Sequence, residues 1–404
     1  MYIILLSLIK ETMLDKKITE FANLFVNFYR KDTLPISLSV PKVNEKDISF
    51  VQSVLQEGWL STAGPYTQMF EEKISSVFDD LHVAALNSGT SALHMSLNAI
   101  GIEENDEVLT TPLTFIAPIN TIRYLNANPI FIDISRENLA ISKDKIIDFA
   151  KKNFKFKNNI TFNKITKNPV KALLLVDVYG LVPDYEFFRN FCSEYNLKLI
   201  VDSSESLGSN YKMKTSASFS DLSVTSFNGN KIITTGSGGA VISSNEDLIS
   251  KIKHISTTAN SSTVPYLYQH DQVGYNYRLP SINAALGISQ LDDLENRVKF
   301  KRKLHEKYKE KINEINGVSI LSEAKETQSN YWLNFFYFDT NQDKDFKNLF
   351  LEALNNKGIG ARAVWDLANS FEYLSKFLCD DLENAKFMYS QGFNLPSGLD
   401  VDLN

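Results

Sequence analysis

The sequence has few cysteines and histidines. Cys192 and Cys379 are the only cysteines in 404 residues, too few for a disulfide framework or a cysteine-rich metal site, and this scarcity favours a reducing cytoplasm. The histidines lie apart without the spacing of metal ligands, so we expect no bound metal; they are His82, His94, His254, His270 and His305.

A basic excess and a targeting segment are missing as well. The formal net charge is -6, whereas general nucleic-acid-binding proteins carry an excess of Lys and Arg. Residues 1–9 are apolar, but a helix that spans a bilayer needs about 20 such residues, and no signal-peptide cleavage pattern follows. We expect a soluble protein without membrane or nucleic-acid partners, with an extended start or loosely ordered tail at residues 1–12.

Two motifs of other enzyme classes are also absent. No expected strand is followed by Gly-x-Gly-x-x-Gly, so a dinucleotide site is not indicated. No Gly-x-Ser-x-Gly occurs either, which argues against the nucleophile elbow of an α/β-hydrolase.

Short apolar strands alternate with amphipathic helices over much of the chain. We expect strands at 83–86, 107–111, 129–134, 172–176, 197–201, 221–227 and 240–243, and helices at 92–100, 115–126 and 185–195. This alternation predicts an α/β fold with a mostly parallel central sheet and helices on both faces. The polar stretch 142–168 is expected to form a helix and a surface loop with little chemistry.

The pattern divides the chain into three parts. An N-terminal extension and helix occupy 1–34, a large domain occupies 35–285, and a linking helix with a smaller C-terminal α+β domain occupies 286–404. The link is predicted as one long, charged helix over 281–315. The smaller domain is expected to contain a strand at 331–338 and helices at 344–357 and 383–391.

The most informative stretch is a lysine loop between two expected strands, residues 226–239. It contains one lysine, Lys231, followed by glycines at positions 236, 238 and 239. A lysine held on a turn between buried strands can be partly desolvated, which is what an amine needs to form a Schiff base with a carbonyl compound. Most lysines are simply exposed, so Lys231 gains weight only if other parts of the chain fit the same chemistry.

Three other positions fit it, although each also has an ordinary structural explanation. The turn Ser88-Gly89-Thr90 opens a helix, where free N–H groups can bind a phosphate or serve only as a cap. Phe115 can stack on an aromatic ligand or belong to the core. Asp202 ends an apolar strand, where its carboxylate needs a positive partner or caps the next helix. The polar candidates all lie at the carboxyl ends of strands, where ligands bind in such sheets.

In combination, these motifs resemble the DegT/StrS family of pyridoxal-phosphate sugar aminotransferases. The matching strings are Ser-Phe-x-x-x-Lys-x-x-x-x-Gly-x-Gly-Gly at 226–239, Asn-Ser-Gly-Thr-Ser-Ala-Leu at 87–93, Asp-Ser-Ser-Glu-Ser-Leu-Gly at 202–208 and Gly-Tyr-Asn-Tyr-Arg-Leu-Pro at 274–280. They occur in family order, and the resemblance covers about residues 35–396. It implies the pyridoxal-phosphate-dependent transferase fold of type I, with pyridoxal 5'-phosphate as cofactor.

The resemblance also implies roles for individual residues. Lys231 would carry the cofactor and Asp202 would pair with its pyridine nitrogen, so these two are the catalytic candidates. The implied cofactor-binding residues are Ser88, Gly89, Thr90, Phe115, Asp202, Glu205, Ser226, Lys231 and Asn276. The implied substrate-binding residues are Glu205, Arg278, Tyr331 and Trp365; in relatives, the segment that contains Arg278 reaches across to the partner subunit.

The string 226–235 is similar to one branch of the family, which aminates UDP-linked 4-keto-6-deoxy-N-acetylhexosamines. The resemblance therefore predicts a cytoplasmic homodimer that transfers an amino group from L-glutamate to UDP-2-acetamido-2,6-dideoxy-4-hexulose for surface glycan synthesis. Ser203 and Ser204 stand where relatives have alanines, and Asp177 stands where they often have histidine. The histidine difference is expected to shift the electrostatics of the pocket.

Several alternatives remain open. A dTDP- or GDP-linked acceptor, or a 3-keto sugar, cannot be separated from the UDP-linked 4-keto sugar by motif spacing. Sugar dehydratases of the same fold replace the lysine with histidine, so Lys231 argues against that activity. A non-catalytic sugar-nucleotide-binding regulator would not need Lys231, Asp202 and Glu205 together.

Overall fold

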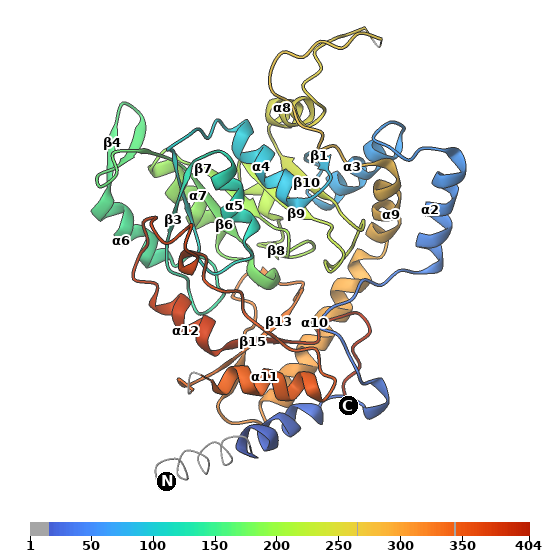
Figure 1. The fold of residues 1–404 in the computed structure, drawn as a ribbon, viewed down its shortest axis with the longest axis vertical. Helices are drawn as coiled ribbons and strands as arrows, with labels where there is room; N and C mark the ends of the chain where they lie inside the picture. The colour runs from blue at the N-terminus through green and yellow to red at the C-terminus, as the bar shows by residue number, and fades with distance from the viewer. Residues whose placement is uncertain (1–15, 265, 343–344) are drawn as a thin grey trace.

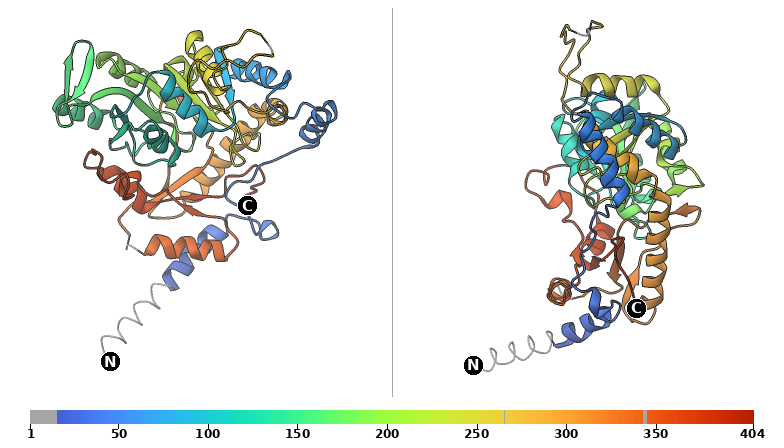
Figure 2. Two further views of the ribbon diagram at one scale, coloured as in Figure 1. Left: turned by 45° about the horizontal axis from the view of Figure 1, so that its top comes forward. Right: turned by 90° about the vertical axis from the view of Figure 1, so that its right-hand side faces the viewer.

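Two β-sheets of different size organise the chain (Figure 1). The computed structural model describes residues 16–264, 266–342 and 345–404. The tail expected at residues 1–12 lies outside the described residues. The larger sheet has nine strands and the smaller has four, and Figure 2 shows the smaller one packed below the larger along the long axis of the molecule.

The large sheet is parallel in its centre and antiparallel at its margins. Strands β9, β7, β6, β2 and β3 run parallel in that order. Beyond β9, β10 pairs antiparallel with β9 and β1 pairs antiparallel with β10. The hairpin β4–β5 joins the sheet through β5, which pairs antiparallel with β6. The bounds are β1 His82–Leu86, β2 Glu107–Thr110, β3 Asn128–Phe131, β4 Phe154–Lys157, β5 Ile160–Asn163, β6 Pro169–Val176, β7 Lys198–Asp202, β9 Leu222–Ser226 and β10 Gly239–Ser243.

Helices cover both faces of this sheet, as the α/β pattern predicts. Successive residues of a strand point to opposite faces, and in β7 Ile200 faces one hydrophobic core while Leu199 and Val201 face another. One face is covered by α4 (Gly89–Ala99), α5 (Ala117–Tyr124) and α8 (Glu246–Ser256). The other is covered by α3 (Tyr66–Val77), α9 (Ser281–Leu291), α6 (Lys143–Asn153) and α7 (Tyr185–Glu194), with α2 (Glu45–Glu57) packed on α9.

The smaller sheet carries an aromatic core. Its order is β11 (Val318–Ile320), β13 (Asn334–Phe338), β15 (Gly392–Leu395) and β14 (Arg362–Ala363), and α11 (Phe346–Asn356) and α12 (Glu383–Gln391) pack beside it. The N-terminal helix, residues 16–26, shares this core because Phe25 lies within 5.1 Å of the Phe350 ring. The first described residues therefore pack with the C-terminal domain.

The long helix expected over 281–315 is divided into two. Helix α9 ends at Leu291 and α10 (Leu294–Ile312) begins after a turn at Asp292 and Asp293. Asp292 forms ion pairs with Lys46 and Lys73, and Asp293 accepts a hydrogen bond from Arg297 at 3.2 Å. These carboxylates are satisfied by partners outside α9, which fixes the turn between the helices.

Helix α10 joins the two sheets. Arg297 donates a hydrogen bond to the Ile232 carbonyl in the lysine loop at 3.2 Å. One turn later, Lys301 donates to the carbonyls of Trp332 at 2.9 Å and Ser397 at 2.5 Å. None of the described helices is long and apolar enough to cross a membrane.

The stretch 142–168 contains a β-hairpin that the sequence analysis did not predict. Helix α6 is followed by β4 and β5, joined at Asn158 and Asn159, whose φ angles are 51° and 62°. Two residues with positive φ form the turn that matches the twist of a hairpin, and asparagine tolerates that conformation. A second unpredicted pairing is the short ribbon of β8 (Asn210–Tyr211) with β12 (Thr327–Gln328).

Candidate active site

A cavity of about 590 Å³ lies between the two sheets, at the carboxyl ends of the central parallel strands. Nine of the predicted site residues line it: Ser88, Gly89, Thr90, Phe115, Asp202, Glu205, Ser226, Lys231 and Trp365. Three others, Asn276, Arg278 and Tyr331, are not among its lining residues. The fold therefore brings most of the dispersed motifs to one place.

The lysine loop is anchored by the residues around Lys231. Phe227, Ile232 and Ile233 are buried in the core beneath the large sheet, and the Phe227 N–H donates to the Gly238 carbonyl at 2.8 Å. Because its neighbours are fixed, Lys231 extends into the cavity with its side chain only 14% exposed. Its Nζ lies 3.2 Å from Glu205 Oε1 and 3.9 Å from the centre of the Trp332 ring.

Two buried carboxyl groups face Lys231. Burial raises the pKa of Asp202 and of Glu205 above their ordinary values, and the positive charge of Lys231 partly offsets both shifts. Backbone amides also hold the carboxylates, because Ser204 N donates to Asp202 Oδ1 at 3.0 Å and Tyr179 N donates to Glu205 Oε2 at 2.8 Å. Asp202 lies at the end of β7, where it can pair with a positively charged group in the cavity.

The start of α4 forms a tight cradle. Ser88 caps the helix, since its Oγ accepts from Ser91 N at 3.0 Å. A Cβ added at Gly89 would lie 2.8 Å from Ser226 Cβ, and one added at Gly239 would lie 2.5 Å from the Ser88 backbone. Only glycine permits this close packing, which brings the N-terminus of α4 and Ser226 against the lysine loop.

Aromatic side chains form a wall of the cavity. Tyr179 stacks on Trp365 with ring centres 4.8 Å apart, and Trp332 donates from Nε1 to the Asn230 carbonyl at 2.8 Å. Phe115 lines the cavity from the loop before α5 and is 53% exposed, so one ring face is available to a ligand.

Tyr331 was predicted to bind substrate, but its neighbour Trp332 is the residue that lines the cavity and contacts Lys231. Tyr331 is 3% exposed and stacks on His305 with ring centres 3.6 Å apart, on the side of α10. Its φ of 46° interrupts the expected strand, which begins only at Asn334. Trp332 directly follows Tyr331 in the sequence, but strand alternation alone could not choose between adjacent aromatic residues.

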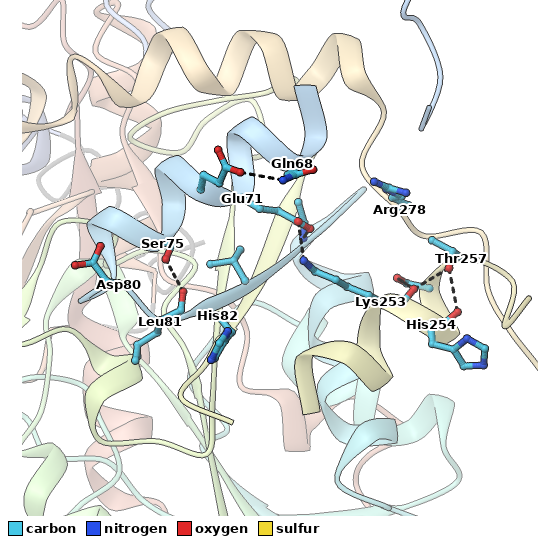
Figure 3. Close-up of a pocket in the computed structure, with 14 residues that line it drawn as sticks. Gln68, Glu71, Ser75, Asp80, Leu81, His82, Lys253, His254, Thr257 and Arg278 are labelled. Atoms are coloured by element: carbon cyan, nitrogen blue, oxygen red, sulfur yellow. Dashed lines mark hydrogen bonds and ion pairs between the residues drawn. The ribbon is translucent and has the colours of Figure 1, made fainter. Parts of the chain in front are cut away.

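Arg278 lies at a second cavity, of about 650 Å³, lined by residues of α3, β1 and α8 (Figure 3). Across it, Lys253 Nζ pairs with Glu71 Oε2 at 2.7 Å, whereas no hydrogen bond or ion pair of the Arg278 side chain occurs within the described residues. Asn276 is nearby in the chain, and its carbonyl accepts from Asn87 Nδ2 at 3.4 Å. Both residues thus lie apart from the cavity that contains Lys231.

The first cavity fits a phosphorylated pyridine ring by the chemistry of its residues. The glycine-lined helix N-terminus with the Ser226 hydroxyl suits a phosphate, and Phe115 and Asp202 suit the face and nitrogen of the ring. Lys231 provides the amine that a carbonyl group requires. Within the described part of the chain, no three His, Cys, Asp or Glu side chains are placed to hold a metal ion.

A model of the DegT/DnrJ/EryC1/StrS aminotransferase family matches residues 41–403. The chain belongs to this family. It is 36% identical over 293 residues to a GDP-perosamine synthase from Escherichia coli, covering 72% of this chain and 75% of the relative. It is 32% identical over 375 residues to a UDP-4-amino-4,6-dideoxy-N-acetyl-β-L-altrosamine transaminase from Campylobacter jejuni, covering 91% of this chain and 94% of the relative.

A solved structure agrees with this DegT/DnrJ/EryC1/StrS assignment. It is Helicobacter pylori PseC, an aminotransferase involved in the biosynthesis of pseudoaminic acid, with a TM-score of 0.81 and 25% identity over 91% of this chain and 95% of that one. The predicted family, fold, enzyme class and cofactor are confirmed: the protein is a pyridoxal-phosphate-dependent sugar aminotransferase. Its substrate is a nucleotide-linked keto-sugar.

Proposed function

We propose that the enzyme transfers the amino group of L-glutamate to C4 of UDP-2-acetamido-2,6-dideoxy-4-hexulose in the cytoplasm. The observation that carries the proposal is Lys231, whose amine lies in one cavity with Asp202 and the glycine-lined start of α4. The altrosamine transaminase, a relative over most of the chain, supports the UDP-linked acceptor. The GDP-perosamine synthase relative favours a GDP-linked acceptor as the second candidate.

Residues of this chain would bind the cofactor and transfer protons during the reaction. When bound, pyridoxal phosphate supplies the carbonyl carbon that carries the amino group between substrates and a ring that takes up electrons. Ser88, Gly89, Thr90 and Ser226 would hold its phosphate. Asp202 would keep the ring nitrogen charged, and Lys231 Nζ would move a proton on and off the substrate carbon as general base and acid.

Trp365 and Glu205 are the proposed substrate-side residues of the same chain. Trp365 lines the cavity beside Tyr179, on the side of the smaller sheet, where a sugar ring can pack on an aromatic face. Glu205 Oε1 contacts Lys231 Nζ directly, so it can orient the amine toward the sugar. Tyr331, by contrast, is enclosed between α10 and the loop that contains Glu323, and it could act only through Trp332.

We also propose a homodimer in which each protomer completes the other's active site. The segment between α8 and α9 protrudes from the large sheet (Figures 1 and 2). Tyr266, Tyr268 and Val273 on it are 81%, 79% and 80% exposed. A second copy of the chain would cover these apolar side chains and would bring Asn276 and Arg278 to the partner's cavity, where a guanidinium suits a carboxylate or phosphate.

Two measurements on the purified protein test the proposal. Borohydride reduction followed by peptide mapping should place the pyridoxyl group on Lys231; a label on another lysine would refute the site. Incubation with glutamate and matched UDP-, GDP- and dTDP-linked 4-keto-6-deoxy sugars should give 2-oxoglutarate fastest with the UDP-sugar. Turnover of the GDP-sugar alone would refute the acceptor while leaving the site intact.

A further inference from the structure

Asp177 is a buried carboxyl group directly behind the proposed active site. It follows β6, and its N–H donates to the carbonyl of Asp202 at 3.1 Å. Its side chain is completely buried. Oδ2 accepts hydrogen bonds from Tyr185 Oη and Ser206 Oγ, both at 2.6 Å, whereas Oδ1 is buried without a hydrogen-bond partner in the described structure.

The hydroxyl groups around Asp177 belong to a larger buried network. Tyr185 also interacts with Ser216, whose Oγ lies 2.7 Å from Ser223 Oγ. Ser223 Oγ in turn lies 3.0 Å from Ser203 Oγ, on the residue after Asp202. The network therefore leads from Asp177 back to the end of β7, through groups that can each donate or accept a proton.

Three carboxyl groups share this region with one cation. The charged groups that face Asp177 are Asp202, at the end of β7, and Glu205, in the loop that follows; Tyr185 of α7 and Ser206 face it as hydroxyl groups. The cation is Lys231, and its contact is with Glu205. No Lys, Arg or His side chain within the described ranges forms an ion pair with Asp177.

We propose that Asp177 is a positioning residue that holds a proton in the folded protein until the pH approaches neutrality and so reserves the charge of Lys231 for Asp202 and Glu205. A buried carboxylate without a cation is costly, and it becomes neutral more readily than one that is paired. Asp202 and Glu205 accept from backbone amides and interact with Lys231. Asp177 is the member of the cluster that lacks such a cation, and hydroxyl partners can satisfy a carboxylic acid as well as a carboxylate.

Burial agrees with this assignment. It raises the pKa of Asp177 from 3.8 to about 7, against the opposing effects of Ser206 and Tyr185. As pH rises from about 4 to about 7, the unfolded chain loses this proton while the folded protein keeps it. The folded state therefore loses stability relative to a variant without the carboxyl group, and above about pH 7 the difference becomes constant.

The test uses cofactor-free protein, so its outcome does not depend on the proposed acceptor or on turnover. The thermal midpoint of Asp177→Asn minus that of the native protein should increase from pH 5 to pH 7 and then level off. Asp221→Asn is the control: against the effect of burial, hydrogen bonds from the Leu199 N–H and from Arg189 at 2.8 Å lower the pKa of Asp221, so this variant should not gain stability relative to the native protein over this range. A difference for Asp177→Asn that is constant from pH 5 to pH 8 would overturn the proposal.

A second measurement covers the case in which Asp177→Asn does not fold. The infrared C=O band of a protonated carboxyl group should be present in the native protein at pH 6 and disappear around pH 7. In Ser206→Ala, which removes one donor to Oδ2, the band should persist to a higher pH. Absence of the band at pH 6 would show that Asp177 is already charged, and an unchanged band in Ser206→Ala would assign it to another carboxyl group; either result overturns the proposal.

The positioning role has its own readout, which rests on the proposed function. In the native enzyme, ionisation of Asp177 adds a third negative charge beside Asp202 and Glu205, so kcat/KM should bend near pH 7. In Asp177→Asn this bend should be missing while turnover persists. If the bend remains although the infrared band is lost, the network holds a proton but does not act on the reaction.

Discussion

At the scale of the residue, Lys231 owes its environment to backbone groups as much as to charges. Trp332, whose ring lies beside Lys231 Nζ, is held by one hydrogen bond of its side chain and one of its backbone. The indole N–H donates to the Asn230 carbonyl, and the Trp332 carbonyl accepts from Lys301. Lys301 is thus an indirect support of the site, and it is a lysine with no carboxylate in direct contact within the described chain.

The stability contribution of Lys301 should depend on pH. Burial lowers its pKa from 10.5 to about 7, with Asp400 opposing the shift. Between about pH 7 and 10 the unfolded chain binds this proton and the folded protein does not, so the folded protein gains stability as pH rises. In denaturation experiments, the free energy of unfolding of the native protein minus that of Lys301→Met should therefore increase from pH 7 to pH 9, by up to about 1.4 kcal/mol per pH unit.

Lys46→Met is the control for this prediction. The Lys46 side chain is 65% exposed, and its hydrogen bond to Asp292 raises its pKa, so the folded and unfolded chains both hold this proton from pH 7 to 9. The stability difference between Lys46→Met and the native protein should stay constant over the same range. An equally constant difference for Lys301→Met would contradict a lowered pKa in the folded state.

The sequence predicted which residues line the site better than it predicted the side chains that those residues contact. Lys231, Asp202 and Gly89 follow strands, and parallel strands end at one edge of the sheet, so their meeting could be inferred from order alone. Trp332 and the stacking of Tyr331 on His305 depend on a positive φ at residue 331. That conformation arises from packing against α10, which no local pattern encodes.

At the scale of the element, the first turn of α4 and the start of β10 are packed backbone to backbone. A side chain at Gly239 would meet main-chain atoms of Ser88 and Gly89, which cannot rotate away. The same contact sets the distance between the proposed phosphate cradle and the lysine loop. Any displacement of β10 would therefore move the helix N-terminus relative to Lys231.

Gly239→Ala should destabilise the protein by about 3 kcal/mol, the upper range for overpacking, and should weaken cofactor binding. Gly229→Ala is the matched control in the same loop, because a Cβ there meets nothing within 4 Å. It should change stability by no more than about 0.5 kcal/mol. Thermal denaturation and a pyridoxal-phosphate titration of both variants check this; equal effects at the two positions would contradict the packing argument.

The sequence predicted helices and strands correctly where the apolar periodicity was long. The predictions were wrong where the residues of a turn determined the structure. Strands β6 and β7 and helices α7 and α12 lie where the pattern placed them. The hairpin β4–β5 was assigned to helix and loop because the stretch is rich in lysine and asparagine, although its residues 154–157, Phe-Lys-Phe-Lys, alternate apolar and charged side chains as a strand does. The sequence pattern did not predict the break between α9 and α10, because the ion-pair partners of Asp292 are Lys46 and Lys73, which are distant in sequence.

At the scale of the whole molecule, the cavity around Lys231 contains few of the cations that the phosphate groups of a nucleotide sugar need. Lys231 and Arg362 are the cationic residues that line it in the described structure. Arg278 belongs to the segment between α8 and α9 and lines the second cavity instead. A dimer that exchanges this segment would supply the missing guanidinium.

Mixing two inactive variants tests this arrangement. Lys231→Ala and Arg278→Ala should each lose activity, the first by roughly 10²- to 10⁴-fold because its general base is gone. After random reassociation, about one quarter of native activity should return, because half of the dimers are mixed and each contains one intact site. Activity that stays at the level of the separate variants would place Arg278 outside the partner's site.

Helix α10 has a mechanical consequence for substrate exchange. Arg297 and Lys301, one turn apart on the same helix, hold the lysine loop at Ile232 and the smaller sheet at Trp332 and Ser397. An amino donor and a bulky sugar nucleotide must use the same cavity in turn, yet the two sheets cannot move apart at this helix without breaking those hydrogen bonds. We therefore expect the enzyme to admit substrates of different size by movement at the rim of the cavity, with Lys231 and Trp332 held in place relative to each other.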